Sequence, residues 1–334
     1  MIANQVTLAR IAALPIPCAM LLFGDACWYW VAFFLFVFLG MTDFIDGMMA
    51  RREGPTKLGS LLDPVADKIM IAAVTFALAV KGWVPVWIPV AILSREFLVT
   101  VLRSSVSLRK AEVKTTILAK LKTIIQMGGF GNVFLTVFLP TAYAQVVALF
   151  WALFFFAIWV VYRVFLKRNA PHWAAPVGFC FVYWYGLLQF LLTDQVCAGL
   201  CYVIVAITWV SAIDYLKTSF ALIRSTGMFR FDWIRLFWVL SHSILAVWVG
   251  SVDFYLTIPV LIAVSFELAT GGIDNIAISD GTVLSNRIFW PSSIVALALA
   301  LYPQEPLAYV LAVLSLGMCL TAYRGVLWRF FPGR

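Results

Sequence analysis

The sequence predicts an all-α polytopic membrane protein with about twelve transmembrane helices. Of its 334 residues, 63% are hydrophobic and only 12% are charged, and the mean hydropathy is +0.98. Soluble domains carry about 25% charged residues, so this chain is too apolar for that class. Apolar stretches of about 20 residues, long enough to cross a bilayer of about 30 Å, recur from end to end.

The expected helices follow one another with short polar turns, which leaves little room for a soluble domain. The stretches that define them cover residues 8–24, 27–50, 61–81, 83–106, 119–140, 143–165, 175–193, 196–222, 231–250, 254–272, 287–303 and 306–328. The opening MIANQVTLAR lacks the basic start and small-residue cleavage site of a secretory signal. The first stretch is therefore expected to remain in the protein as a helix.

The basic residues predict the orientation in the membrane. If both termini are cytoplasmic, the basic loop residues fall inside, and Lys81 alone lies in an outward loop. The inside residues are Arg51, Arg52, Lys57, Arg109, Lys110, Lys114, Lys167, Arg168, Arg224, Arg230 and Arg329. This asymmetry follows the positive-inside rule, so orientation and anionic lipid account for the net charge of +8. We expect no binding of nucleic acid.

Four of the 16 acidic residues lie close together at the ends of two expected helices: Asp43, Asp46, Asp63 and Asp67. An ionisable side chain inside a bilayer costs at least about 2.5 kcal/mol, so such residues are candidates for function. The spacings i, i+3 and i, i+4 put each pair on one helix face. The loop REGPTKLG joins the two helices, so an antiparallel hairpin brings both pairs together at the cytoplasmic membrane surface.

Clustered carboxylates repel one another unless cations lie between them, and an all-oxygen ligand set suits Mg²⁺ or Mn²⁺. Hard ions at such a site usually bind phosphate oxygens too, which indicates phosphoryl-type transfer at a two-metal site. Gly47, Ala50 and Gly59 leave space beside the acids. The alternative is a salt-bridged helix end, with counter-ions that would be Arg51, Arg52, Lys57 and Lys68.

These residues form the pattern D-x2-D-G-x2-A-R followed by G-x3-D-x3-D, which resembles the signature of the CDP-alcohol phosphotransferase family. The resemblance implies a core of six transmembrane helices, with the signature on the second and third. It also implies that Asp43, Asp46 and Asp63 ligate the metals that hold the CDP diphosphate. Asp67 would be both ligand and general base. The residues assigned to CDP binding are Gly47, Ala50, Arg51, Gly59 and Thr7.

Further segments look like one branch of that family, the phosphatidylglycerophosphate synthases. They are the N-x2-T-x2-R of Asn4, Thr7 and Arg10, then SREFLV at 94–99, AKLKTIIQM at 119–127 and TWVSAIDYLKTSF near Asp214. The acceptor would then be sn-glycerol 3-phosphate, an anion that needs a cationic pocket. Arg103, Lys120 and Lys122 stand at helix ends suited to bind its phosphate. Their alternative role is positive-inside anchoring.

The chain departs from the family pattern in two places. Two extra apolar segments within 143–193 precede the TWVSAIDYLKTSF helix and are interpreted as an inserted helical pair. The pattern then stops near residue 225. The sequence therefore predicts a CDP-alcohol phosphotransferase domain over 1–225 and a C-terminal transmembrane extension over 226–334, whose acidic residues form no recognisable catalytic set.

The resemblance predicts an enzyme of phospholipid synthesis that transfers a phosphatidyl group from CDP-diacylglycerol to glycerol 3-phosphate, releasing CMP. It would be a multi-pass membrane protein with a cytoplasmic active site, in the inner membrane if the source is a bacterium, and a homodimer as family members often are. One alternative is another acceptor: inositol phosphate, serine or phosphatidylglycerol. Another is a transporter or scaffold with an inactive core.

Overall fold

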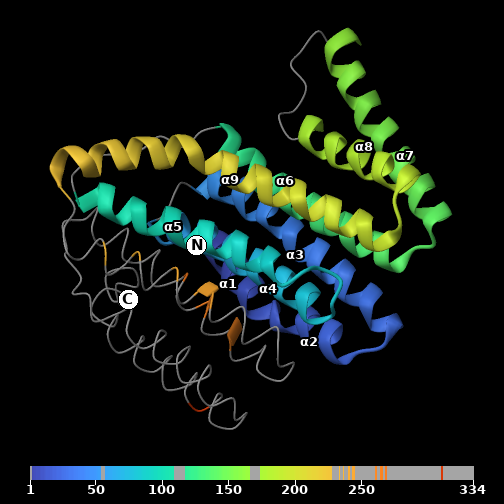
Figure 1. Ribbon diagram of the computed structural model, residues 1–334, viewed down its shortest axis with the longest axis horizontal. Coiled ribbons are helices and arrows are strands. Elements are labelled where there is room, and N and C mark those ends of the chain that lie inside the picture. Colours follow the sequence, from blue (N-terminus) through green and yellow to red (C-terminus); the bar gives the residue numbers. More distant parts are fainter. Residues whose placement is uncertain are drawn as a thin grey trace.

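The computed structural model describes the backbone of residues 2–53, 57–108, 117–165 and 174–227, with single positions between 233 and 310. Side chains are described within 5–42, 63–103, 121–164 and 174–227, and at Val106 and those single positions. Every regular element in this part of the chain is helical, and no strand occurs in it (Figure 1). The all-α prediction is confirmed there.

The described helices correspond in order to the predicted stretches from 8–24 to 196–222, with ends that shift by a few residues. They are α1 (Ile2–Ala13), α2 (Pro15–Phe23), α3 (Ala26–Glu53), α4 (Lys57–Val80), α5 (Trp87–Leu108), α6 (Ile117–Phe138), α7 (Thr141–Val160), the π-helical turn η1 (Val161–Phe165), α8 (Ala174–Phe190) and α9 (Thr193–Thr226).

The first predicted stretch corresponds to one candidate membrane span, Gln5–Phe23, in which a single turn residue, Leu14, separates α1 from α2. The chain is helical from Ile2 and breaks at Leu14, whose N–H donates to the carbonyls of Arg10 at 3.2 Å and Ile11 at 3.3 Å. Pro15 has no N–H to continue this ladder, so the helix ends and α2 restarts with proline at its first position.

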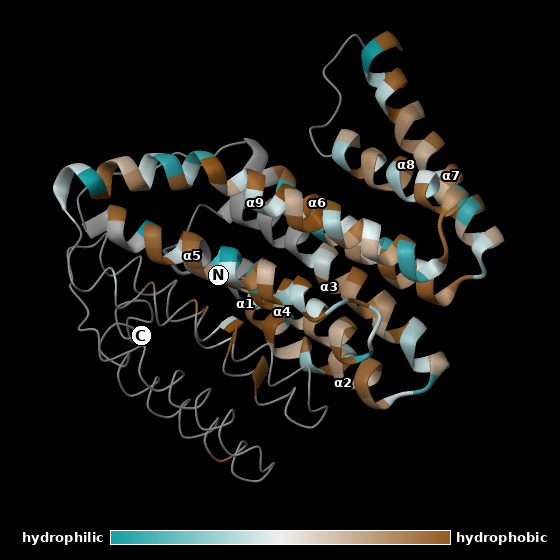
Figure 2. Ribbon diagram, in the orientation of Figure 1, coloured by the Kyte–Doolittle hydropathy of each residue, from teal (hydrophilic) through white to brown (hydrophobic). Residues whose placement is uncertain are grey.

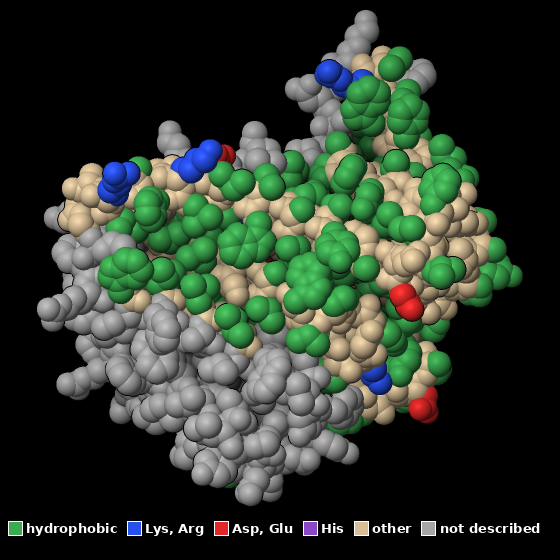
Figure 3. All heavy atoms as spheres, viewed as in Figure 1, with side chains coloured by type: hydrophobic (Ala, Val, Ile, Leu, Met, Phe, Trp, Pro, Cys, Tyr) green, Lys and Arg blue, Asp and Glu red, His purple; other side chains and the backbone are tan. Residues whose placement is uncertain are grey.

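Four helical segments are long and apolar enough to cross a membrane: Gln5–Phe23, Leu121–Phe138, Thr141–Val164 and Thr193–Thr226. Hydrophilic residues gather near helix ends, as at the left end of α9 (Figure 2). Apolar side chains dominate the visible surface of the described residues (Figure 3). The chain is therefore a membrane protein. Apart from single positions, the predicted helices 231–250, 254–272, 287–303 and 306–328 lie outside the described residues.

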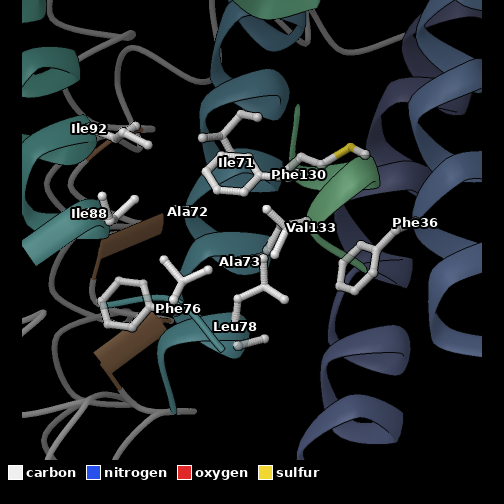
Figure 4. Packing of buried hydrophobic residues seen from close by; sticks show 14 of the residues in the cluster. Phe36, Ile71, Ala72, Ala73, Phe76, Leu78, Ile88, Ile92, Phe130 and Val133 are labelled. Atoms are coloured by element: carbon white, nitrogen blue, oxygen red, sulfur yellow. The ribbon is translucent and has the colours of Figure 1, made fainter. Parts of the chain in front are cut away.

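Helix α4 lies at the centre of the core. Nearly every residue from Val65 to Ala79 is buried, and an apolar helix covered on all sides belongs inside a bundle. Figure 4 shows Phe76 of α4 beside Ile88 of α5, and Ile71 beside Phe130 of α6. This packing fixes the end of α4 that carries Asp63 and Asp67. The charge pattern predicts that this end is cytoplasmic.

Helices α6 and α9 approach closely at Gly129. A Cβ atom there would lie 2.6 Å from Ile204 Cδ1 and 2.7 Å from Ile204 Cγ1, and Ile204 is itself buried. Gly129→Ala is therefore expected to destabilise the protein by about 1–3 kcal/mol through overpacking. The thermal midpoint of the detergent-solubilised protein measures this effect.

Gly131 supplies the matched control, because nothing lies within 4 Å of a Cβ built on it. Gly131→Ala is expected to leave the midpoint unchanged or raise it, since alanine is the better helix former by about 1 kcal/mol. Equal midpoints for the two variants would contradict the close packing of α6 on α9.

The predicted inserted pair corresponds to α7 and α8. The Trp184 indole of α8 donates to Thr136 Oγ1 of α6 at 2.7 Å, and the Asn132 amide of α6 donates to the Cys180 carbonyl at 3.1 Å. Gln145 ties α7 to α8 through the Leu188 carbonyl at 2.9 Å. The pair extends from the bundle (Figure 1), and α7 leaves most of its apolar side chains exposed. Such a surface suits contact with lipid.

Candidate active site

Two of the four predicted aspartates have described side chains, and both are partly exposed at one end of α4. Asp63 and Asp67 are spaced i, i+4, so they share a helix face. The Asp67 side chain is 29% exposed. The apolar part of α4 beyond them is buried, which fixes where these carboxylates stand. Two anionic groups are thus held open to approach at the end of a rigid element.

Helix α1 supplies a polar partner to each of these acids. The Thr7 hydroxyl donates to Asp63 Oδ1 at 3.3 Å, and Arg10 Nη1 lies 3.6 Å from Asp67 Oδ1. Thr7 and Arg10 are almost fully buried, with 1% and 2% of their surface exposed. Thr7 and Arg10 share one face of α1, and Asp63 and Asp67 share one face of α4, so the two faces meet. Each contact orients one carboxylate.

The same helix lies against α3, which carries the other predicted pair. Helix α1 packs on both α3 and α4, and each of these contacts is more extensive than the contact between α3 and α4. The predicted loop REGPTKLG is also shorter than expected, because α3 runs to Glu53 and α4 begins at Lys57. The N-terminal helix is thus a third element of the site, beside the predicted hairpin.

Several predicted site residues lie outside the described side chains. For Asp43, Asp46, Gly47, Ala50, Arg51 and Gly59, only the helical backbone is described, on α3 and α4. The Lys120 side chain also falls outside, on α6. The roles assigned to these residues stay predictions.

The oxygen donors of Asp63 and Asp67 fit a hard divalent ion, because they stand one helical turn apart in a partly exposed position. Within the described side chains no group of three or more potential ligands converges, as two of the four aspartates are not among them. Lys68, one predicted counter-ion, donates instead to Thr100 of α5 at 2.6 Å. The described contacts of Lys68 thus give no support to a salt-bridged helix end.

Behind the aspartates lies a buried polar network that sequence reasoning did not identify. Glu96 of α5 accepts hydrogen bonds from Lys122 of α6 and, at 3.1 Å, from Nη1 of its neighbour Arg95. All three residues are buried. Lys122, predicted to bind the acceptor phosphate, thus has its ammonium group between α5 and α6, close enough to Asp67 for their charges to interact.

Arg95 connects this network to α9. Its Nε donates to the Thr208 carbonyl at 3.1 Å and its Nη2 to Ser211 Oγ at 3.0 Å. Gln126 of α6 donates to Thr208 Oγ1 at 2.8 Å. Further along α5, Arg103 is exposed and hydrogen-bonded to Tyr215 of α9. Helix α9, which follows the predicted insertion, is therefore bonded to the network of α5 and α6.

Comparison with known proteins gives two kinds of match. A model of the CDP-alcohol phosphatidyltransferase family matches residues 1–159. The CDP-diacylglycerol–glycerol-3-phosphate 3-phosphatidyltransferase of Rickettsia bellii is 39% identical over 125 residues, 37% of this chain and 69% of the relative. The protein of the same name from Bacillus subtilis is 34% identical over 137 residues, 37% of this chain and 71% of the relative.

A third relative extends the match slightly further. The probable phosphatidylglycerophosphate synthase of Mycobacterium tuberculosis is 35% identical over 152 residues, 44% of this chain and 72% of the relative. No solved structure matches the chain.

Proposed function

Because the chain belongs to the CDP-alcohol phosphatidyltransferase family, we propose that it transfers the phosphatidyl group of CDP-diacylglycerol to sn-glycerol 3-phosphate. The products are phosphatidylglycerophosphate and CMP. The enzyme class follows from the family, and the acceptor is proposed from relatives that are named for glycerol 3-phosphate. The structural observation that supports the reaction is the pair Asp63 and Asp67, each oriented by a buried residue of α1.

In the proposed reaction, Asp67 takes the proton from the acceptor hydroxyl as that oxygen attacks the phosphorus that carries diacylglycerol. The bond from this phosphorus to the bridging diphosphate oxygen breaks, and the electron pair leaves with CMP. Arg10 holds the Asp67 carboxylate in place, and Thr7 does the same for Asp63. The reacting groups thereby meet in a fixed geometry.

The four aspartates would hold two divalent ions, Mg²⁺ or Mn²⁺. Asp43 and Asp46 on α3 and Asp63 and Asp67 on α4 are the proposed ligands. Bound ions of this kind neutralise charge on a diphosphate. Gly47, Ala50, Arg51 and Gly59 are proposed to border the cytidine and diphosphate, with Thr7 completing the CDP site from α1.

The acceptor phosphate is proposed to bind Arg103, Lys120 and Lys122. Arg103→Gln is expected to raise the KM for glycerol 3-phosphate about 10-fold, because a charge-assisted contact to phosphate is lost. The KM for CDP-diacylglycerol should stay within about 2-fold, since that substrate binds elsewhere. Initial rates at varied concentrations of each substrate measure both constants.

Arg163→Gln is the matched control, as Arg163 is an exposed arginine of η1. If Arg103 served only as a positive-inside anchor, the two variants would have the same small effect on both constants. That result would remove Arg103 from the acceptor site.

The membrane arrangement is proposed from the charge pattern. About twelve spans place both termini and the acidic site on the cytoplasmic side. Residues 1–225 form the transferase domain with the inserted pair inside it, and 226–334 form a transmembrane extension. A homodimer is proposed because members of the family are often homodimers. Cysteine accessibility in sealed vesicles, on either side of each span, tests the orientation.

Release of CMP tests the reaction class. Purified protein in detergent receives cytidine-labelled CDP-diacylglycerol with and without glycerol 3-phosphate, and with and without Mg²⁺ or Mn²⁺. CMP release that needs both the acceptor and the metal supports the proposal. Release without an acceptor would indicate hydrolysis, and no release from folded protein would indicate a transporter or scaffold with an inactive core.

A further inference from the structure

We propose that Glu96 is a positioning residue for the transfer reaction, which holds the ammonium group of Lys122 in place for the anionic acceptor. This inference rests on the proposed function, since it concerns how the same site receives a phosphorylated acceptor. It adds a carboxylate on α5 that is neither a proposed metal ligand nor the proposed base. Its effect on the reaction passes through Lys122.

Glu96 and Lys122 form an ion pair that is buried inside the helical bundle. Glu96 is 3% exposed and Lys122 is 9% exposed, and they join α5 to α6. Replacing a buried ion pair by apolar residues often leaves stability unchanged or raises it, so stability alone is a weak reason for this pair. Ionisable residues inside a membrane are, by default, functional candidates.

The Glu96 carboxylate is also held by its neighbour Arg95. The Oε1 atom that accepts from Lys122 also accepts from Arg95 Nη1, and the other guanidinium nitrogens of Arg95 bond to α9 at Thr208 and Ser211. Thr100 donates to the Glu96 carbonyl at 2.7 Å and accepts from Lys68. The Glu96 carboxylate is thus held by Arg95, which α9 holds in turn, and a carboxylate held in this way can orient Lys122.

Cationic side chains outnumber carboxylates around Glu96. Three cations, Lys122, Arg95 and Lys68, act on the single carboxylate of Glu96. The charge of Lys122 also interacts with that of Asp67. The positive charge around Glu96 therefore exceeds what its single carboxylate neutralises. An acceptor phosphate that enters beside Asp67 meets an ammonium group that is already in place.

The experiment compares four variants of the full chain in detergent: Glu96→Gln, Glu96→Asp, Lys122→Met and the double variant of Glu96→Gln with Lys122→Met. We expect Glu96→Gln to raise the KM for glycerol 3-phosphate about 10-fold, while the KM for CDP-diacylglycerol stays within about 2-fold. Glu96→Asp keeps the charge and should recover most of the loss. In the Lys122→Met background, Glu96→Gln should add less than about 2-fold.

Gln126→Leu is the matched control within the network. It removes a buried hydrogen bond between α6 and α9 but no contact of Lys122, and the Thr208 hydroxyl still donates to the Ile204 carbonyl at 2.7 Å. We expect its KM for glycerol 3-phosphate to equal that of the parent. Size-exclusion profiles and thermal midpoints show which variants are folded.

Three results would overturn the inference: an equal loss for both substrates, no recovery in Glu96→Asp, or a full additional effect in the Lys122→Met background. If Glu96→Gln does not fold, Glu96→Asp and the double variant decide, because the latter removes both charges of the Glu96–Lys122 pair. The double variant should still raise the acceptor KM about 10-fold. A parental KM there would overturn the inference. A parent that makes no phosphatidylglycerophosphate instead overturns the proposed function.

Discussion

Replacing Asp67 by asparagine is expected to lower kcat by about 10²–10⁴-fold, the usual contribution of a general base. The amide has the size of the carboxylate but cannot accept the proton of the acceptor hydroxyl. Arg10 would still face the amide oxygen, so the packing of α1 on α4 should survive. Binding of CDP-diacylglycerol should be retained in part, since three aspartates remain for the metals. Single-turnover transfer and binding of a CDP analogue measure the two effects separately.

Asp194→Asn is the control for this variant. Asp194 is an exposed acid in the first turn of α9, at the end opposite Arg224. Its replacement should cost at most about 1 kcal/mol of helix stability and leave kcat unchanged. Asp67→Asn protein that keeps more than about a tenth of the parental kcat would exclude Asp67 as the base.

Replacing Asp43 by asparagine is expected to abolish metal and nucleotide binding together. Asp43 is proposed as a ligand of the ions that hold the diphosphate, and it has no proposed part in proton transfer. Losing one carboxylate from a hard-ion site removes both a ligand and a charge. Titration with Mn²⁺ and with a CDP analogue should show both affinities falling by at least about 10-fold, the lower range for loss of a ligand's support.

The two aspartate variants are therefore expected to fail at different steps of the reaction. Asp67→Asn protein should bind nucleotide and fail to transfer, whereas Asp43→Asn protein should fail at binding. Removing metal from the parent with a chelator should reproduce the Asp43→Asn behaviour, and restored Mg²⁺ should reverse it. Equal nucleotide binding by Asp43→Asn protein and the parent would contradict the assignment of Asp43.

The sequence was sufficient for the fold class and for the helices up to α9, because apolar runs of membrane length are a strong signal. It also predicted that Asp63 and Asp67 share a helix face. It did not predict the turn before Pro15, because residues 8–24 form one apolar run in the sequence. It also did not predict that Thr7 and Arg10 of α1 contact Asp63 and Asp67 of α4.

The network around Glu96 shows a different limit. The rule that marked the four aspartates also applies to an acid inside the apolar stretch 83–106, so Glu96 could have been identified as a candidate. Its partners could not. Lys122 and Ser211 meet Glu96 and Arg95 only because α6 and α9 pack on α5, and sequence spacing does not report contacts between distant helices.

The most direct test of the central claim is to identify the lipid that the purified protein makes. CDP-diacylglycerol and Mg²⁺ or Mn²⁺ are supplied with glycerol 3-phosphate, inositol 1-phosphate, serine and phosphatidylglycerol together, and the products are resolved by mass spectrometry. We expect phosphatidylglycerophosphate as the dominant product, formed in equal amount with CMP. A dominant product from any other acceptor would contradict it, while leaving the family assignment in place.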